Sequence, residues 1–568
     1  MGVQNANYSK HLLLINRRGW IVSLILIAVA VALITRLFYL TVVNRDFLQH
    51  QGDSRVVRKV IVPAHRGMIL DRHNELLAIS TPAIAVWIDP ALFKATASQY
   101  YRLSQLVHVP VNTILLLVKQ RKNKEFIYLK RALPPQVGDQ VKALNLPGVF
   151  LKQEYHRYYP EGAVMAHVVG LTDIDDKGQE GLELAYDDWL SGRAGVDEVA
   201  KDCLGHIVAK LCSIRAPRSG KNLQLSIDRR IQYIAYRELN DGIKKYQASS
   251  GSIIVLDIKS GELLAMVNWP NYNPNKRQQL NANHSRNRAL TDLFEPGSTI
   301  KTFSMASVLA SGRFTESSQI DTAPGWMIVA GKRIMDERNN GVLDLTKILQ
   351  ISSNMGMSKL VLSLPPNQLR HTLHQVGFGQ LTQSGFPGER AGMLPNFNVW
   401  NPFVLATLSF GYGLSVTLLQ LTQAYAVLAR GGINIPITFL KATDNAPAQT
   451  GERVLDRRIS KRVLNMLESV LAKAGTAPLA RVSGYRVTGK TGTARIVGQH
   501  GYEKNHHNSL FIGIAPASQP RLVVAVLLRD PKAHLYYGGY TAGPIFSRVM
   551  SSALHLLGVE PDDQAGLA

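Results

Sequence analysis

The clearest feature in the pattern of hydrophobic and polar residues is an apolar stretch near the N-terminus. No charged residue interrupts Trp20 to Thr35, and after Arg36 the apolar character resumes from Leu37 to Val43. About 20 predominantly apolar residues cross a bilayer, so residues 20–43 are predicted to form a transmembrane helix. Arg36 lies near its outer end, where a long side chain can reach the lipid headgroups. A buried core helix and a cleaved signal peptide are the alternatives. The run is apolar on all sides, long, and without a convincing small-x-small cleavage site, which favours an uncleaved anchor.

The charges that precede this stretch predict its orientation. Residues 1–19 carry Lys10, Arg17 and Arg18 and no acidic side chain. Basic residues flanking a span tend to stay in the cytoplasm. The pattern predicts a single-pass protein of the inner (plasma) membrane with a cytoplasmic N-terminus, and with everything after residue 44 exported to the periplasmic side.

Residues 44–220 are rich in charge and hold only short apolar runs. Val56 to Val62 is typical of a strand, and Arg66 to Arg72 of a turn between strands. Nothing here has the spacing of a nucleophile and its base, so we expect a non-catalytic structural or partner-binding module. Arg66, Asp71 and Arg157 are most simply interpreted as a structural ion-pair cluster within it.

The pattern changes from residue 221 onward and predicts an α+β domain up to residue 556, with residues 557–568 as a tail. Two apolar runs, Gly251 to Asp257 and Glu262 to Val267, flank a short polar turn that indicates a hairpin. Three more strand-like runs lie near the end, at Arg486 to Arg495, Ser509 to Ala515 and Leu522 to Leu528. Helical stretches lie between, including Ser298 to Ser311 and Leu418 to Ala429. One central antiparallel sheet flanked by helices is therefore expected.

Composition narrows the classes of function only a little. The formal net charge of +23 suits nucleic acid, an anionic membrane or an acidic polymer equally well. The chain has no helix-turn-helix, zinc-knuckle or Gly-rich phosphate-loop pattern, so we expect no nucleic-acid partner. Its two cysteines, Cys203 and Cys212, flank a predicted turn that would set Cys203 opposite His206, which disfavours a disulfide between them. His506 and His507 are interpreted as part of a polar loop, and no metal site is predicted.

Candidate chemistry appears first at Ser298. It follows Pro296-Gly297 and opens a predicted helix, and Lys301 lies three residues on, one turn away on the same face. A serine hydroxyl needs a base to become a good nucleophile. A neutral lysine amine can serve if its pKa is depressed by burial or a like charge. Taken alone, Ser-x-x-Lys is weak evidence for a catalytic site. The alternative is an exposed helix N-terminus with a lysine that has no catalytic role.

Two further motifs follow in a specific order. Ser352-Ser353-Asn354 comes 54 residues later and supplies a hydroxyl and a carboxamide, although a helix N-cap is its simpler interpretation. Lys490-Thr491-Gly492-Thr493 comes another 138 residues on and offers a cation for a carboxylate, a glycine that permits close approach, and an oxyanion N–H. The short patterns recur at Ser285-Arg286-Asn287 and Lys259-Ser260-Gly261, but both precede Ser298. The order of the three motifs is that of serine enzymes that recognise β-lactams.

These motifs and several longer segments resemble the class B penicillin-binding proteins, most closely the division-specific peptidoglycan D,D-transpeptidases (FtsI type). The similar segments are Arg66 to Arg72, Arg157 to Gly162, Gly181 to Glu183, Glu295 to Ser298, Ser409 to Gly413, Lys490 to Thr493 and Tyr537 to Gly539. The resemblance implies an elongated pedestal or dimerisation domain over residues 44–220 and a penicillin-binding transpeptidase domain over residues 221–556.

The resemblance also implies a role for each candidate residue. Ser298 would attack the bond between the two D-alanines of a peptidoglycan stem peptide, and β-lactams would acylate the same serine. Lys301 would accept its proton, Ser352 would pass that proton on, and Asn354 would hold the donor peptide. Lys490, Thr491 and Thr493 would bind the terminal carboxylate. Gly492 and Tyr412 would line the substrate site. No cofactor is expected.

The partners implied are a polytopic glycosyltransferase and other membrane proteins of the divisome, at the division septum. An elongation-type class B transpeptidase and a catalytically idle divisome scaffold are the alternative functions. The scaffold is disfavoured because all three catalytic motifs are intact. A β-lactamase is disfavoured because we identify no deacylating glutamate.

Overall fold

The computed structural model describes residues 4–202, 207–442, 451–498, 501–532 and 536–563. The chain divides into two compact units. One comprises residues 1–64 and 193–219, and the other comprises residues 65–192 and 220–568. The unit boundaries show that the segment before residue 220 contributes to both units.

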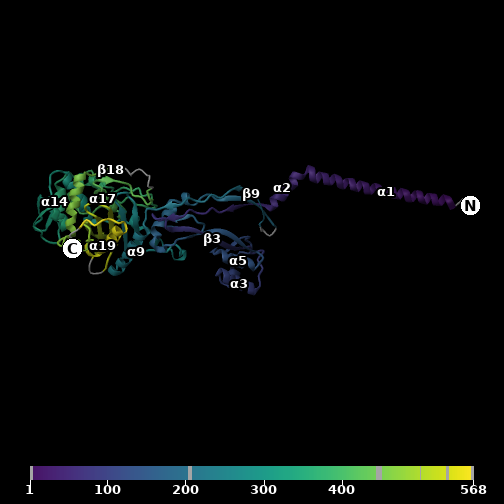
Figure 1. Cartoon of the computed structure of the whole chain (residues 1–568), viewed down its shortest axis with the longest axis horizontal. Coiled ribbons are helices and arrows are strands. Elements are labelled where there is room, and N and C mark those ends of the chain that lie inside the picture. Colours follow the sequence, from purple (N-terminus) through teal and green to yellow (C-terminus); the bar gives the residue numbers. More distant parts are fainter. Residues whose placement is uncertain (1–3, 203–206, 443–450, 499–500, 533–535, 564–568) are drawn as a thin grey trace. The chain divides into compact units, whose positions relative to one another are not determined.

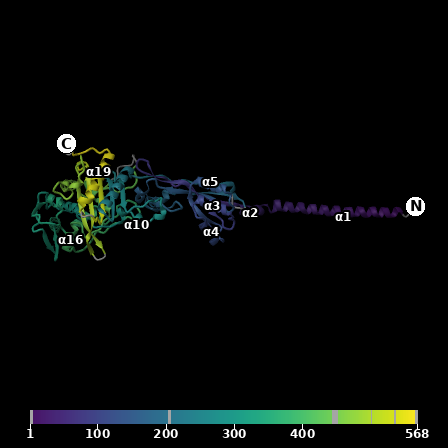
Figure 2. The ribbon, with the colours of Figure 1, turned by 90° about the horizontal axis from the view of Figure 1, so that it is seen from below.

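The first unit consists of the N-terminal helix and a small sheet. Helix α1 (Gln4–Phe38) continues into a π-helical turn at Tyr39–Val43, and α2 (Arg45–Val56) follows (Figure 1 and Figure 2). Residues Arg18–Val43, which include the end of α1 and the π-helical turn, form one helix that is long and apolar enough to cross a membrane. None of its most apolar stretch is buried. This is the span predicted from the apolar run.

The sheet of the first unit is antiparallel, in the order β1 (Val57–Val62), β8 (Gly195–Lys201) and β9 (Ile207–Arg215). Strand β1 agrees with the predicted strand to within one residue. Cys212 lies on β9 as an exposed free thiol, 3.5 Å from a Glu198 carboxylate oxygen. Cys203 and the predicted turn beside it lie outside the described residues.

The N-terminal part of the second unit is a mixed α/β module. Its sheet runs in the order β10 (Leu223–Gln224), β2 (Ile69–Leu70), β3 (Leu76–Ile88) and β4 (Ile127–Leu133), and β5 (Val149–Tyr158) also pairs with β3. Helices α3 (Ala97–Val107), α4 (Val111–Gln120) and α5 (Pro135–Ala143) share a separate apolar core with β3 and β4. Burial of one face of each helix accounts for the short apolar runs in this stretch.

A buried ion cluster ties this module together, although its membership differs from the prediction. Glu183 is its centre: its carboxylate pairs with Arg66 at 2.7 Å and with Arg157 at 2.7 Å, and all three side chains are at most 1% exposed. Asp187 gives Arg66 a second carboxylate at 2.7 Å. The placement of Asp71 in this cluster was wrong. Its carboxylate instead accepts hydrogen bonds from backbone N–H groups of His73, Glu75 and Arg229.

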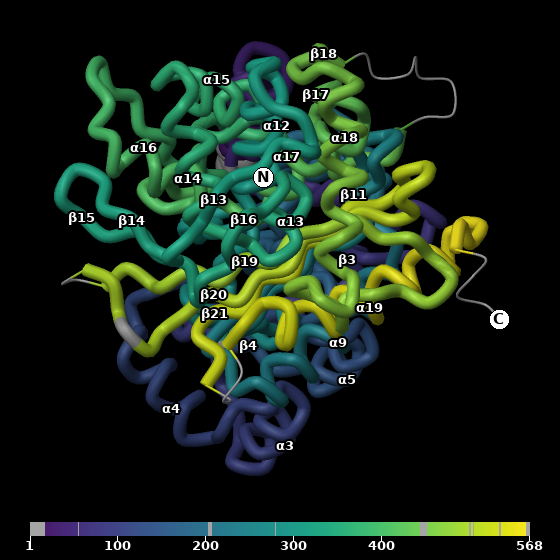
Figure 3. The backbone as a smooth tube through the Cα atoms, turned by 90° about the vertical axis from the view of Figure 1, so that its left-hand side faces the viewer, coloured from purple at the N-terminus to yellow at the C-terminus, as the bar shows by residue number. Residues whose placement is uncertain are grey.

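The C-terminal part of the second unit is organised around the predicted antiparallel sheet. Its five strands lie in the order β12 (Leu263–Trp269), β11 (Ser250–Asp257), β21 (Leu522–Arg529), β20 (Gly501–Ala515) and β19 (Thr488–Gly498). Helices α9 (Arg229–Tyr246) and α19 (Gly538–Leu556) cover one face, and α17 (Leu418–Ala429) and α18 (Arg457–Glu468) the other (Figure 3). Because helices cover both faces, β11 is buried along its whole length, which explains its continuous apolar run.

Helices and two small strand pairs packed beside this sheet carry the remaining motifs. The helices are α12 (Lys301–Ala310), α13 (Leu345–Gln350), α14 (Asn354–Leu362), α15 (Gln368–Gln375) and α16 (Pro402–Leu408). One such strand pair is the hairpin of β14 (Trp326–Val329) with β15 (Lys332–Met335), and in the other β17 (Ile433–Asn434) pairs with the more distant β18 (Glu452–Arg453). Strand β13 (Gln319–Asp321) pairs with β16 (Val342–Asp344). The α+β fold class predicted from the sequence is confirmed.

Candidate active site

Ser298 lies in a tight turn that leads directly into a buried helix. A 3-10 turn covers Gly297–Ile300, and α12 begins at Lys301. The turn packs very closely against a second loop, since a Cβ at Gly411 would lie 2.0 Å from the carbonyl oxygen of Gly297. Gly411 also has a φ of +90°, a conformation that favours glycine. Position 411 therefore requires glycine for Ser298 to hold its place.

The Lys301 side chain is fully buried and joins two of the predicted motifs. Its Nζ lies 3.1 Å from Ser298 Oγ and 3.1 Å from Ser352 Oγ. It lies closer to two oxygens that can only accept, at 2.5 Å from the Ser352 carbonyl and 2.7 Å from Asn354 Oδ1. One amine thus contacts all the side-chain oxygens that the sequence assigned to proton transfer.

This environment favours a neutral amine. Burial lowers the pKa of Lys301 to about 7, although the carboxylates of Asp336 and Glu337 oppose that shift. A neutral amine has two N–H bonds and one lone pair. The two N–H bonds satisfy the carbonyl of Ser352 and the amide oxygen of Asn354. The lone pair is then left for a hydroxyl, and Ser298 Oγ is within reach to give up its proton.

The segment Ser352-Ser353-Asn354 holds this geometry through local backbone structure. Ser352 follows Ile351, the C-cap of α13, and has a φ of +64°, an uncommon value for serine that is typical of strained functional positions. Ser353, not Ser352, is the N-cap of α14, since its hydroxyl accepts from the Gly356 N–H at 2.9 Å. The capping function therefore falls on the residue between the two candidates and leaves Ser352 and Asn354 to face Lys301.

The Lys490 motif forms the edge of the central sheet. Among the described strands, β19 pairs only with β20, and Lys490 is fully buried on it. Burial, with the added repulsion of Lys301, lowers the pKa of Lys490 well below its ordinary value. A substrate carboxylate beside it would favour the charged form again. A Cβ at Gly492 would lie 2.9 Å from the Pro296 carbonyl oxygen, so this glycine lets β19 approach the turn that carries Ser298.

The remaining predicted residues line the same region. The Thr491 hydroxyl is nearly buried and lies 3.0 Å from that of Thr476, and Thr493 Oγ1 accepts from the Gly538 N–H at 3.2 Å. Tyr412 is half-buried, and its ring meets that of Tyr502 edge-on at 5.5 Å. The two discarded patterns lie elsewhere: Lys259-Ser260-Gly261 occupies the β11–β12 turn, and Asn287 is buried against Asn268.

Comparison with known proteins agrees with this geometry. The penicillin-binding protein transpeptidase domain matches residues 251–551, and the penicillin-binding protein dimerisation domain matches residues 61–225. The chain belongs to the penicillin-binding proteins. It is 42% identical to the probable peptidoglycan D,D-transpeptidase PbpC of Pseudomonas aeruginosa over 96% of both chains. It is 39% identical to the peptidoglycan D,D-transpeptidase FtsI of Escherichia coli, covering 95% of this chain and 91% of that protein.

Solved structures extend the comparison to three dimensions. A crystal structure of penicillin-binding protein 3 from Mycobacterium tuberculosis, complexed with aztreonam, matches 89% of this chain and 98% of that one, with a TM-score of 0.69 and 27% identity. The transpeptidase domain of penicillin-binding protein 3 from Burkholderia pseudomallei is 38% identical over 60% of this chain and 98% of that one, with a TM-score of 0.55. The two-domain architecture of this penicillin-binding protein is therefore shared.

Asp336 is a site residue of this penicillin-binding protein that sequence reasoning missed. It is buried, and its carboxylate accepts from the Ser353 hydroxyl at 2.5 Å, the Asn354 N–H at 2.6 Å and the Met355 N–H at 3.0 Å. A carboxylate at a helix N-terminus is stabilising there. Asp336 lies well before the motif and follows β15, so no short spacing rule identifies it. It positions the segment that holds Ser352 and Asn354.

The prediction of a polar loop at His506 and His507 was wrong. Both lie within β20, where His507 pairs with Arg495 across the β19–β20 ladder. His506 Nδ1 contacts an Asp530 carboxylate oxygen at 2.8 Å, and the His507 ring stacks on Tyr536 at 4.3 Å. The sheet extends through this polar stretch because ladder hydrogen bonds do not depend on side-chain polarity. In the part of the chain that the structure describes, no group of three or more His, Cys, Asp or Glu is placed to hold a metal.

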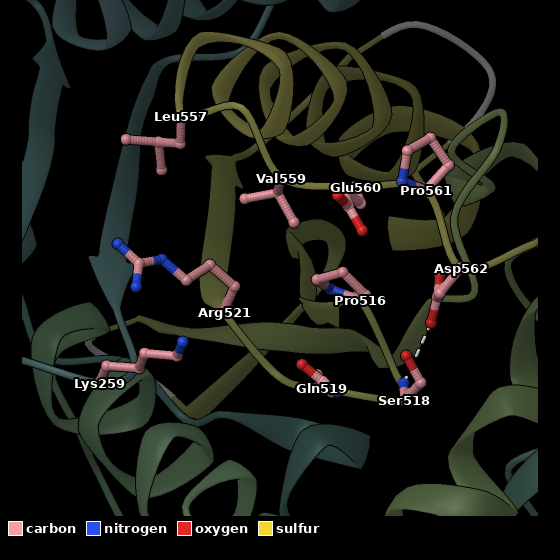
Figure 4. Close-up of a pocket in the computed structure, with 10 residues that line it drawn as sticks. All are labelled: Lys259, Pro516, Ser518, Gln519, Arg521, Leu557, Val559, Glu560, Pro561 and Asp562. Carbon is pink, nitrogen blue, oxygen red and sulfur yellow. Dashed lines mark hydrogen bonds between the residues drawn. The ribbon is translucent and has the colours of Figure 1, made fainter.

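A pocket of about 510 Å³ lies away from the predicted site residues (Figure 4). It is lined by the β11–β12 turn at Lys259, by the β20–β21 connection at Pro516 and Arg521, and by the segment after α19 at Val559 and Asp562. Asp562 accepts from the Ser518 N–H at 3.1 Å across it. It contains none of the predicted site residues.

Proposed function

We propose that this chain is a peptidoglycan D,D-transpeptidase of the division type, and that Ser298 is its nucleophile. The observation that carries the proposal is the contact set of the buried Lys301 amine, which reaches Ser298, Ser352 and Asn354 at once. Relatives at 39–42% identity over nearly the whole chain bear that activity in their names, including FtsI of Escherichia coli.

In the acylation step, Ser298 Oγ attacks the carbonyl carbon between the last two D-alanines of a stem peptide. The hydroxyl proton passes to the Lys301 amine. Backbone N–H groups of Ser298 and Thr493 stabilise the developing oxyanion. The bond to the terminal D-alanine then breaks, and its nitrogen receives the proton by way of the Ser352 hydroxyl. The result is an acyl-enzyme ester on Ser298 and a free D-alanine.

In the second step, the amine of a neighbouring stem attacks the ester carbonyl. Its proton returns through the same hydroxyl and amine, a new peptide bond forms, and Ser298 is restored. Asn354 holds the donor peptide, and Gly492 and Tyr412 line the groove that receives it. Lys490, Thr491 and Thr493 bind the terminal carboxylate. A β-lactam would acylate Ser298 by the same route.

The same proposal assigns the rest of the chain. Residues 1–19 form a cytoplasmic tail, 20–43 the anchor in the inner membrane, 44–220 the pedestal, 221–556 the exported transpeptidase domain and 557–568 a tail. The partners would be a polytopic glycosyltransferase and other divisome membrane proteins at the septum. Support comes from the apolar helix, from the matched dimerisation domain and from the FtsI relatives.

The test is labelling of the full-length protein with a fluorescent penicillin. The wild type should acquire a covalent label, and Ser298→Ala should acquire none because the attacking oxygen is gone. Ser304→Ala, which removes a buried hydroxyl from α12, the helix that follows Ser298, is the matched control and should still be labelled. Equal labelling of the wild type and Ser298→Ala would overturn the assignment.

A further inference from the structure

A tight turn places one exposed carboxylate at the rim of the active site. The turn comprises residues 336–341 and follows β15. Asp336 fixes its start through the three hydrogen bonds to the segment 353–355 described above. Asn340 Nδ2 donates to the Arg338 carbonyl at 3.1 Å, and the Gly341 N–H donates to Asn339 Oδ1 at 3.0 Å. Glu337, the second residue, is therefore held beside Asn354.

Glu337 has no cation of its own. Its side chain is exposed, and none of the described lysines or arginines forms an ion pair with it. The adjacent Arg338 donates instead to Asn340 Oδ1 at 3.2 Å. Glu337 is nevertheless close enough to the catalytic amine for its charge to raise the pKa of Lys301, against the larger effect of burial. No described lysine or arginine therefore neutralises this carboxylate, which shares a side-chain hydrogen bond with Tyr537.

The opposite wall of the site lies within reach of the same carboxylate. Tyr537 immediately precedes α19, and the next residue, Gly538, donates to Thr493 of the Lys490 motif at 3.2 Å. The Tyr537 ring stacks on Tyr536 at 4.6 Å. The pKa of Tyr537 is raised by its hydrogen bond with Tyr536, by burial, and by the charge and a side-chain hydrogen bond of Glu337. Through its contact with Tyr537, Glu337 therefore lies close to the strand that the proposed function assigns to substrate binding.

We propose that Glu337 is a specificity residue that binds a cationic group on the donor peptide. The neighbouring Asn354 is the residue assigned to hold that peptide, so the carboxylate flanks the peptide just before its scissile bond. A primary ammonium there would gain a charge-assisted contact with Glu337, and an anionic group would be repelled. This inference rests on the proposed function, because it names the chemistry of the peptide that Ser298 attacks.

The test compares three penicillins on the full-length protein in detergent at pH 6.5. Benzylpenicillin has a neutral side chain, ampicillin adds an amine to it, and carbenicillin adds a carboxylate. The second-order rate constant for acylation of Ser298 is measured for each penicillin by competition with a fluorescent penicillin. The rate constants for ampicillin and for carbenicillin are then each divided by the rate constant for benzylpenicillin. The ratio cancels any change in the basicity of Lys301 that loss of the Glu337 charge causes.

Glu337→Gln should lower the ratio for ampicillin about 1.4- to fivefold, the range expected for an exposed charge pair, and should raise the ratio for carbenicillin. At pH 9 the ampicillin amine is mostly neutral, since α-amines titrate near about 7.7–8.0, and the difference should vanish. The matched control is Glu452→Gln on β18, an exposed position outside the site, which should leave both ratios unchanged.

Two outcomes would overturn the inference: equal ratios in the wild type and Glu337→Gln at pH 6.5, or the same change in Glu452→Gln. Failure of all three penicillins to acylate the wild type would instead contradict the proposed function. The two failures are therefore distinguishable in one set of measurements.

Discussion

The pedestal and the active site each bury basic side chains, but they treat them in opposite ways. Arg66 and Arg157 share the Glu183 carboxylate, and these ion pairs at 2.7 Å compensate the free-energy cost of moving charged groups out of water. Lys301 has only neutral oxygens in direct contact, and its pKa falls to about 7. The difference teaches that burial alone does not indicate function. A buried cation with a carboxylate partner maintains structure, whereas one without such a partner is poised to exchange a proton.

The largest expected effect comes from removing the buried Lys301 amine, which has no carboxylate in direct contact. Lys301→Met should reduce the rate constant for penicillin acylation by about 10²–10⁴-fold, since proton transfer by a positioned base contributes that much. The measurement is the time course of fluorescent labelling. Lys347→Met, which removes an exposed lysine on α13, is the matched control and should be labelled at the wild-type rate. A rapid rate in Lys301→Met would show that another group accepts the serine proton.

The second effect concerns the paired cations. Glu183→Gln keeps the side-chain shape but leaves two buried arginines without their shared charge, and should destabilise the fold by about 3–5 kcal/mol. A lowered midpoint of thermal unfolding would report this. Glu316→Gln breaks only a partly exposed pair with Arg462 and should cost about 0–1 kcal/mol. If both variants unfolded at the same temperature, the cluster would not have the structural role that its burial indicates.

The smallest expected effect is a shift in pH dependence. A neutral Lys301 is the active form, so the acylation rate should fall about tenfold per pH unit below pH 7 and level off above pH 8. Because the Asp336 charge raises the pKa of Lys301, Asp336→Asn should move the pH at which the acylation rate begins to fall to a lower value. The rate of fluorescent labelling between pH 5.5 and pH 9 measures both curves. A flat profile in the wild type would contradict a titrating base near pH 7.

The sequence predicted those parts of the site that depend on short spacing. Ser298 and Lys301 are one turn apart, so their contact follows from helix geometry. The approach of Ser352, Asn354 and Lys490 does not follow from spacing, and only their order along the chain and the family resemblance predicted it. Local patterns likewise predicted the hairpin and the strands of the central sheet, because alternation and turn residues are local signals.

What the sequence could not predict depends on contacts between distant segments. Asp336 lies in a turn with no motif of its own, and only the fold brings its carboxylate to the N-terminus of α14. Asp71 was grouped with the arginines by charge, whereas backbone N–H groups satisfied it. His506 and His507 had a polar pattern typical of a loop, but pairing with β19 extended the strand through them.

The position of β19 in the sheet also affects whether copies of the protein aggregate in a crowded cell. Among the strands that the structure describes, β19 is an end strand with a single partner, and such edges invite another copy of the same chain to pair with them and aggregate. Here the turn that carries Ser298 packs against that edge, with Pro296 and Thr299 close to Gly492. The turn that carries Ser298 therefore shields this part of the edge from pairing with a second folded sheet.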